Sequence, residues 1–320
     1  GFIEFDIDGQ FSGFMGAPRV SPNPIDLFWK KIATKEQLER KKIYLPTNYN
    51  NIDIDNKGFI FATSSQSKNF PGNEAVKRLN PAGDDVLKRQ GFFKPKGDLG
   101  IRKKDQAGNL TVSSSDIIDV TYRKWGGYSL LDRQRGRIFT YDLQGNLLYV
   151  FGCKSNMVGG VQNPIAIESF EGEVFVLDSD LNRITIYEPT KYGELINAGI
   201  KFYFNGQYNQ AKKMWNEVLT KNNNFHLAYK YTGIFLLYHN QYQEAMKYFK
   251  LGNHRERYSK ALSLYIKEHI GEKFGWVFII SLIVMGIIFL AFRYLYLKID
   301  EDLNTPSDTL QYEGDTTIRQ

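Results

Sequence analysis

Cysteine and histidine are scarce in this chain of 320 residues. There is one cysteine, Cys153, so neither an intrachain disulfide nor a zinc site built from several cysteines can form. The four histidines are His226, His239, His254 and His269, so residues 1–225 contain none. This distribution excludes a histidine-ligated metal and a Ser-His-Asp arrangement from the first two thirds of the chain. No glycine-rich phosphate loop joins a strand to a helix either.

A concentrated basic surface is also missing. The net charge of +6 is spread over 41 basic and 35 acidic residues, and no dense Lys/Arg stripe alternates with aromatic residues. Two short basic groups, 102–104 and Arg133, Arg135 and Arg137, are expected to lie on solvated loops and strand edges, with an RNA-binding face as the alternative. We therefore expect no nucleic-acid partner. The chain is longer than one hydrophobic core usually supports, which predicts at least two domains.

A repeat with an interval of 46 residues organises the first part of the chain. In each copy an apolar run is followed by an acidic turn and a second alternating run, as in consecutive antiparallel strands. The matching residues are Leu131, Asp132, Arg137, Ile138 and Tyr141 in one copy, and Leu177, Asp178, Arg183, Ile184 and Tyr187 in the other. A β repeat of this length predicts the blades of a β-propeller.

The second copy resembles a known family. Residues 164–168 form a proline-led apolar strand, residues 172–178 a glycine-led strand ending in Asp, and residues 182–184 an Asn-Arg-Ile opening to the next strand. These segments resemble NHL repeats, which are related to YVTN and lactonase-type propellers. The resemblance implies that residues 1–190 are an all-β, partial NHL-like propeller of about three and a half blades.

Two further features belong to this region. Residues 2–9 parallel residues 138–145, each with Asp and Gly three apart, so the chain is expected to begin inside a blade with other blades missing. Residues 24–42 interrupt the strand pattern with a helical insertion, where Ile25, Phe28, Trp29 and Ile32 share one face. That face is expected to pack on the propeller; the alternative is a helix that binds a partner or a membrane surface.

Three carboxylates are the candidate channel or metal residues. Asp53 and Asp119 lie in Ile-Asp-Ile and Ile-Asp-Val alternations, which place them opposite the aliphatic residues, and Glu168 lies in the third such strand. On innermost strands they would approach a central channel, where they solvate and hydrogen-bond. The alternative is a lactonase-like hydrolase, in which they would hold a divalent ion such as calcium to polarise a lactone carbonyl. The metal is otherwise unknown, and no other cofactor is expected.

After residue 190 the repeat interval becomes 34 residues. The equivalent pairs are Gly199 with Gly233, Tyr208 with Tyr242, Ala211 with Ala245, and Trp215 with Phe249. The pattern resembles the tetratricopeptide repeat, in which small residues let two antiparallel helices touch and a large ring fills the adjacent gap. Residues 191–270 are thus expected to hold two such all-α hairpins and a capping helix from His254. The resemblance implies that six residues line a peptide groove, although packing against the propeller or the capping helix is the alternative: Ile200, Tyr203, Phe204, Ile234, Leu237 and Tyr238.

An apolar stretch follows the helical repeats. Residues 275–292 carry no charge, and the aromatic residues that follow extend the stretch to 297, which predicts one transmembrane helix; the alternative is a buried helix of a soluble protein. Residues 298–320 are expected to be a polar tail or linker. Lys260, Lys267 and Lys273 before the stretch slightly outnumber Arg293 and Lys298 after it, which favours a cytoplasmic first part.

The order of the domains points the other way. A propeller, tetratricopeptide hairpins and a single span resemble bacterial envelope proteins with an outward-facing propeller, related to components encoded beside carbohydrate ABC transporters. We therefore expect an extracytoplasmic propeller on a cell-membrane protein. Its expected role is an interaction scaffold or ligand sensor, accessory to carbohydrate transport, with a protein or peptide bound by the helical repeats.

Overall fold

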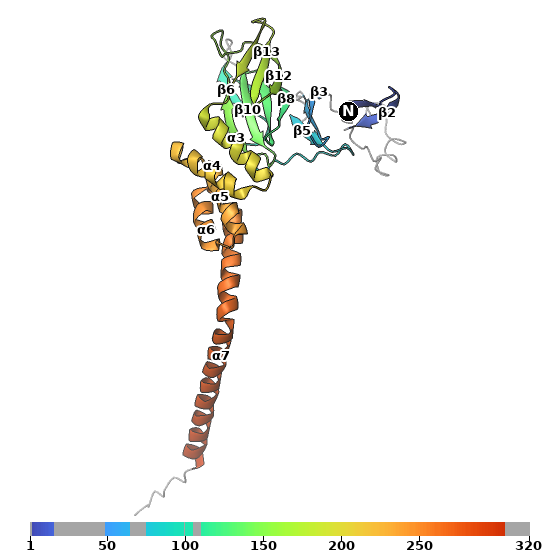
Figure 1. Ribbon diagram of the computed structural model, residues 1–320. Coiled ribbons are helices and arrows are strands. Elements are labelled where there is room, and N and C mark those ends of the chain that lie inside the picture. The colour runs from blue at the N-terminus through green and yellow to red at the C-terminus, as the bar shows by residue number, and fades with distance from the viewer. Residues whose placement is uncertain (1, 16–48, 65–74, 99, 105–109, 305–320) are drawn as a thin grey trace, which may run out of the picture.

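The computed structural model describes residues 2–15, 49–64, 75–98, 100–104 and 110–304. Antiparallel sheets come first and helices follow, and the last helix extends far from the rest (Figure 1). The predicted order of an all-β part, an all-α part and one apolar helix is confirmed at this level. The helical insertion expected at 24–42 lies outside the described residues.

The β region contains small antiparallel sheets in which each strand pairs with its neighbours along the chain. The first sheet pairs β1 (Phe2–Phe5) with β2 (Phe11–Met15), and the second contains β3 (Tyr49–Ile54), β4 (Ile60–Ser64) and β5 (Val76–Leu79). A third sheet pairs β6 (Ile101–Lys104) with β7 (Leu110–Ser113), and a fourth contains β8 (Ile117–Arg123), β9 (Gly127–Asp132), β10 (Arg137–Asp142) and β11 (Leu147–Phe151). The last contains β12 (Pro164–Phe170), β13 (Glu173–Asp178) and β14 (Arg183–Tyr187). This up-and-down order requires only short connections.

The 46-residue repeat of the sequence is a repeat of hairpin geometry. Leu131 faces Ile138 across β9 and β10, and Leu177 faces Ile184 across β13 and β14. Asp132 and Asp178, which end β9 and β13, each accept hydrogen bonds from the following turn and from the loop that leads into their own sheet. The predicted strand pattern is therefore confirmed, and the repeated aspartate has a structural task in both copies.

The turn that closes two of the hairpins is also repeated. Asp6 accepts N–H groups from Asp8 and Gln10, and Asp142 accepts N–H groups from Gln144 and Asn146. In both turns a glycine three residues after the aspartate has positive φ, which a residue with a side chain rarely adopts. The parallel between residues 2–9 and 138–145 is therefore confirmed as the same turn.

The sheet β8–β11 lies between two others and is buried on both faces. Toward β3–β5, its residues Val120, Leu130 and Phe139 pack with Phe61 and Val76. Toward β12–β14, a second cluster is formed by Ile118, Leu131, Ile138, Ile167, Val174 and Val176. The alternation of strand side chains supplies both clusters from the same strands.

The described sheets do not close into a ring, and the outer faces of the two flanking sheets remain open. Ile52 and Ile54 are 44% and 58% exposed, whereas Asp53 between them points toward β8. The isoleucines and Asp53 therefore lie on opposite faces of β3, as the alternation predicts, and the isoleucine face is exposed. On β12–β14 the exposed apolar face consists of Ile165, Leu177, Ile184 and Ile186.

Four helices form two hairpins below the sheets: α3 (Lys191–Phe204) with α4 (Tyr208–Lys221), and α5 (His226–Tyr238) with α6 (Tyr242–Leu251). A Cβ on Gly199 would lie 2.7 Å from the Trp215 ring, and one on Gly233 would lie 2.7 Å from the Phe249 ring. The predicted contact between a glycine and a large ring is confirmed in both hairpins. Each glycine is required because the ring occupies the space that a side chain would need.

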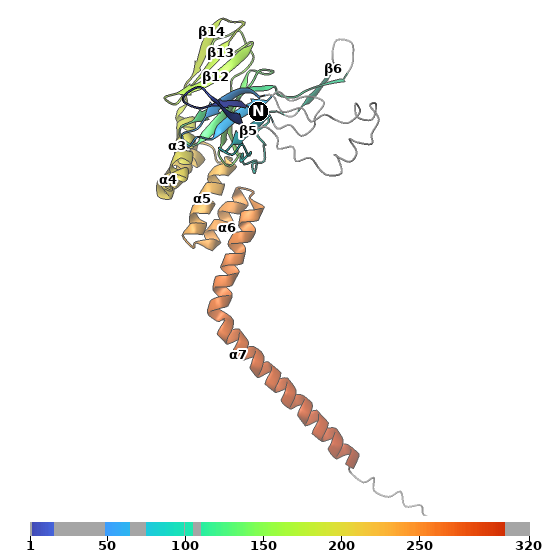
Figure 2. The same ribbon diagram turned by 90° about the vertical axis from the view of Figure 1, so that its right-hand side faces the viewer.

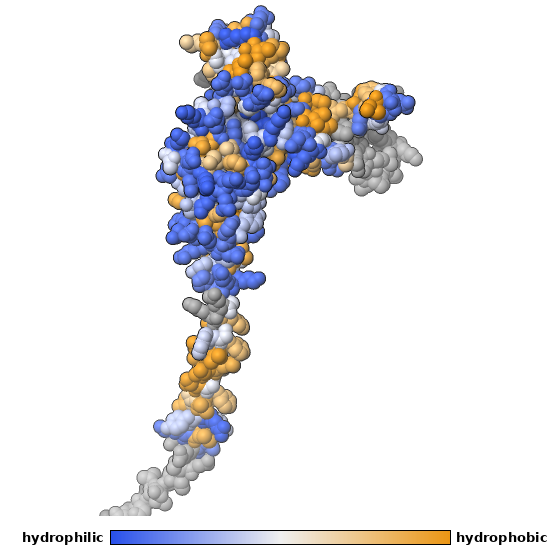
Figure 3. Space-filling model, in the orientation of Figure 1, coloured by the Kyte–Doolittle hydropathy of each residue, from blue (hydrophilic) through white to orange (hydrophobic). Residues whose placement is uncertain are grey.

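The last helix, α7 (Arg255–Asn304), runs through 50 residues without a break. This one helix covers the segment predicted as a capping helix from His254 and the predicted span 275–297, and it continues to Asn304. Its first turns pack on α6, with Ala261 fully buried, and it bends below the hairpins (Figure 2). Its stretch Phe274–Asp300 is apolar and unburied, as the orange surface in Figure 3 shows, and is long enough to cross a membrane.

Candidate functional site

Each of the candidate carboxylates Asp53 and Asp119 joins two sheets. Asp53 on β3 accepts the backbone N–H of Tyr122 on β8. One carboxylate oxygen of Asp119 on β8 accepts the backbone N–H of Ile167 on β12 at 2.7 Å. The other oxygen accepts the backbone N–H of the neighbouring Val120, also at 2.7 Å. The first strands of adjacent sheets, β3, β8 and β12, do not pair with one another. These carboxylates therefore accept backbone N–H groups that would otherwise lack a partner.

Glu168 makes a third contact of this kind. Its Oε1 accepts the Ser169 N–H at 2.8 Å and the Thr121 hydroxyl of β8 at 3.2 Å. Beside it lies a pocket of about 270 Å³, whose lining includes Asp119, Glu168, Ile167 and Asn51. Asp119 and Glu168 thus line one pocket, whereas Asp53 is not part of its lining, and the approach of the three carboxylates to a central channel stays a prediction.

Asp119 has a perturbed acidity. Burial raises the pKa of its carboxyl group to about 6, with smaller contributions in the same direction from the charges of Glu168 and Asp53. The two backbone hydrogen bonds oppose the shift, because they favour the ionised form. Near neutral pH ionisation of Asp119 therefore costs free energy, because its surroundings favour the protonated carboxyl group.

The geometry of these carboxylates suits hydrogen bonding better than metal binding. Within the ranges that the structure describes, no group of three or more His, Cys, Asp or Glu side chains is arranged to hold a metal ion. The oxygens nearest the pocket already accept backbone or hydroxyl donors, and calcium needs six to eight oxygen ligands. The calcium-dependent alternative thus stays a prediction without a geometric argument in its favour.

The predicted peptide groove lies mostly inside the helical core. Ile200, Ile234 and Leu237 are buried, because α3 and α5 turn these faces toward the helices packed beside them. A peptide cannot reach them unless the hairpins separate. The alternative stated with that prediction, packing within the molecule, describes these residues better.

The aromatic members of the same set have different surroundings. The rings of Tyr203 and Tyr231 are tilted against each other with 4.5 Å between their centroids, and Phe204 packs over Gly126 in the β8–β9 turn. Only Tyr238 among the six is exposed, at 67%, and it stacks on Tyr208. One exposed tyrosine does not make a groove, so most of the six predicted residues are not accessible to a peptide.

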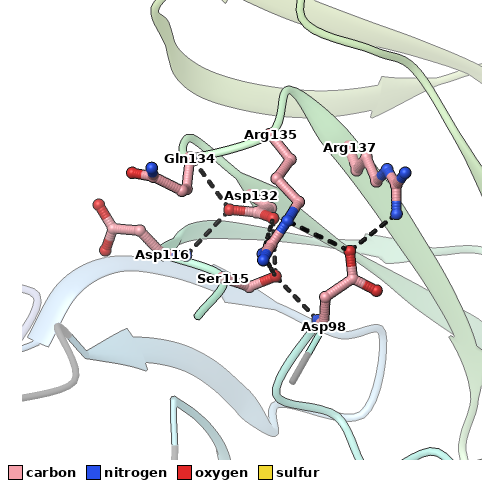
Figure 4. Close-up of polar contacts among 7 residues, drawn as sticks. All are labelled: Asp98, Ser115, Asp116, Asp132, Gln134, Arg135 and Arg137. Atoms are coloured by element: carbon pink, nitrogen blue, oxygen red, sulfur yellow. Dashed lines mark hydrogen bonds and ion pairs between the residues drawn. The ribbon is translucent and has the colours of Figure 1, made fainter. Parts of the chain in front are cut away.

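The arginines considered for RNA binding are held in ion pairs. Arg133 contacts Asp116 at 2.7 Å, and Arg137 contacts Asp98 at 2.8 Å. Arg135 reaches toward Asp98 and Asp132 and donates to the hydroxyl of Ser115, which itself bonds Asp132 (Figure 4). Acidic partners therefore accompany all three arginines, which is unlike a free basic patch for phosphates.

The helices dock on the β region through a buried polar cluster. Tyr231 on α5 donates its hydroxyl to Asp142, and Lys230 donates to Asn146 at 2.9 Å. Asn146 also bonds Asp142 at 2.7 Å, so the turn between β10 and β11 and the helix α5 form one network. Leu148 of β11 joins the helical core beside it. Every one of these partners is buried, which makes the relative placement of sheets and helices specific.

A second pocket lies at this junction and has no counterpart among the predicted sites. It has a volume of about 370 Å³ and lies between β11, the β12–β13 turn, the end of β14 and the start of α3. Arg123 at the end of β8 is its buried charged residue. Position 169, the repeat equivalent of Arg123, is a serine, so the repeat gives no signal for this arginine.

No model of a known protein family matches the chain, and no curated protein is similar enough to it to count as a relative. The family is therefore not shown by comparison.

Proposed function

We propose that this protein is a membrane-anchored binding scaffold, in which sheets and helices form a head that α7 connects to the bilayer. The observation that carries the proposal is the continuity of α7. Its residue Ala261 is fully buried in the helical core, while no residue in the apolar window of Phe274–Asp300 is buried in the molecule. A 27-residue apolar helix is about 40 Å long, which exceeds the hydrocarbon thickness of a bilayer.

A scaffold role agrees with the kind of elements that the head contains. We propose that its β region is part of an NHL-like propeller; the repeated hairpin register and the repeated aspartates Asp132 and Asp178 support this. We propose likewise that the helical hairpins are tetratricopeptide repeats, supported by the two glycine-to-ring contacts. Repeats of both kinds build binding surfaces without catalytic groups.

The proposed cellular location and the proposed role in transport are supported only by the sequence resemblance. The head would face the outside of a bacterial cell and serve as an accessory to carbohydrate transport. For a protein partner, the exposed β face with Ile184 and Ile186 is a better candidate than the predicted helical groove, which is mostly buried.

The anchoring part of the proposal has a direct test. Deletion of residues 275–297 from the full-length protein should move it from the carbonate-resistant membrane fraction to the soluble fraction, because no comparable apolar stretch remains among the described residues. Replacement of the same stretch by leucines is the matched control and should retain membrane association. Full-length protein that is soluble and monodisperse without detergent would contradict the proposal.

A further inference from the structure

Arg123 is a buried cation without a carboxylate partner in the described part of the chain. The residue is 3% exposed, and its guanidinium makes one hydrogen bond, from Nη2 to the carbonyl oxygen of Gly172 at 2.6 Å. The Trp125 ring lies 5.9 Å away, at the outer limit of a cation–π contact. Burial lowers the pKa of Arg123, yet a guanidinium stays charged near neutral pH. An unpaired buried charge costs free energy, which a bound anion would offset.

The junction pocket gives such an anion access to Arg123. Arg123 lines it from β8, and the first turn of the 14-residue helix α3 lines it from the other side with Thr190 and Gly193. First-turn N–H groups of a helix have no acceptor within the helix and favour negative charge. The side chain of Thr190 already accepts the Gly193 N–H, but the helix end still adds positive potential to the same space.

The remaining lining favours an apolar body. Phe151, Tyr187 and Tyr192 contribute aromatic side chains. The Tyr187 hydroxyl donates to the Gly159 carbonyl at 2.9 Å, and the Tyr192 hydroxyl accepts the Asn222 amide at 3.1 Å. Because these hydroxyls are engaged elsewhere, both rings present mainly carbon to the pocket. A volume of about 370 Å³ lies at the small end of the range for ligand pockets.

The charges in the pocket also limit the ligand. Glu188 is a carboxylate in the lining, and it is exposed at the rim. One guanidinium against one carboxylate is poorly suited to a dianion such as phosphate, whereas the planar fork of an arginine matches a single carboxylate.

We propose that the junction pocket binds a small organic monocarboxylate, with its carboxylate at Arg123 and its apolar body against Phe151, Tyr187 and Tyr192. This goes beyond anchoring, because it assigns a small-molecule site where sheets and helices meet. Occupancy of the pocket connects β8, the β12–β13 turn and α3, so a ligand here stabilises the junction itself.

The test uses the full chain in non-ionic detergent and 4-fluorobenzoate as the probe, observed by fluorine NMR. We expect binding with a Kd on the order of 1 mM, and binding of the neutral 4-fluorobenzamide at least about tenfold weaker, since the charged contact is lost. Arg123→Gln should weaken benzoate binding by a similar factor. Arg133→Gln is the matched control, because it removes an exposed arginine paired with Asp116 far from the pocket, and it should bind as the wild type does.

A second variant keeps the test decisive if Arg123→Gln does not fold. Gly193→Leu adds a side chain at the pocket wall, where a Cβ meets only Thr190 and Pro189 at ordinary distances of 3.6 and 3.8 Å. It should leave the melting temperature unchanged or raised and still weaken benzoate binding at least about tenfold. Equal binding of the amide, absence of binding, or wild-type affinity in Gly193→Leu would each overturn the proposal. None of these measurements depends on membrane insertion, so the anchoring proposal stands or fails separately.

Discussion

Asp119 shows how one residue can hold two sheets together and still lower the stability of the fold at neutral pH. Its oxygens pair two backbone donors, one of them on a neighbouring sheet, but burial makes its ionised form costly. The pKa of the carboxyl is about 6 in the folded protein and near 4 in the unfolded chain. The folded state therefore binds the proton more tightly, and between these values the unfolded state loses it first.

The sign of the pH dependence follows. The destabilising contribution of Asp119 is absent below about pH 4, grows as the pH rises toward 6, and reaches about 3 kcal/mol above that. We expect the melting temperature of the wild type in detergent to fall more steeply from pH 4 to 7 than that of Asp119→Asn, which cannot ionise. Asp6→Asn, in an exposed turn, is the control and should keep the wild-type slope. Identical slopes for Asp119→Asn and wild type would contradict the assignment.

Residues in local repeats were predictable, and residues at the junction were not. Gly199, Gly233, Trp215 and Phe249 repeat at one interval and touch partners about 16 residues away, so spacing alone pairs them. Arg123 and Lys230 gain their surroundings from partners that lie much further along the chain, such as Gly172 and Asn146. Periodicity within an element carries no information on such contacts.

At the scale of elements, the two helical hairpins depend on small residues where their helices cross. Ala245 on α6 is fully buried. Ala245→Leu forces a larger side chain into a filled contact, which should cost about 1–3 kcal/mol and lower the melting temperature by several degrees. Gln243→Leu on the exposed side of the same helix is the matched control and should change the melting temperature little. An unchanged melting temperature in Ala245→Leu would contradict the packing of this hairpin.

The boundaries inside α7 illustrate what the sequence does not determine. Gly271 and Gly275, with a charged pair between them, lie where the predicted capping helix and the predicted transmembrane helix were separated. Glycine weakens a helix by only about 1 kcal/mol, and no proline removes a hydrogen bond from residues 255–304, so continuing the helix costs less than ending it. Element type was therefore predictable here, whereas the number of elements was not.

At the scale of the whole molecule, the docking of the helices on the sheets gives the head a defined orientation on α7. The network of Asp142, Asn146, Lys230 and Tyr231 is buried and connects the β10–β11 turn to α5. α6 then packs on the first turns of α7, which continues into the apolar stretch (Figure 1). A ligand at the junction pocket would thus act where the sheets meet the helices that pack on α7.

The side of the membrane on which the head lies can be measured with a residue the chain already has. Cys153 is the only cysteine in the sequence and is exposed on the β region, so a membrane-impermeant maleimide has a single target there. In intact cells that express the full-length protein, we expect labelling of Cys153, because the head is proposed to be extracytoplasmic. Cys153→Ser should abolish the signal, and adding Asp302→Cys to that variant places the target after the apolar stretch, where labelling should require lysis. Labelling of Cys153 only after lysis, with Asp302→Cys accessible in intact cells, would instead agree with the small excess of lysines before the stretch and place the head in the cytoplasm.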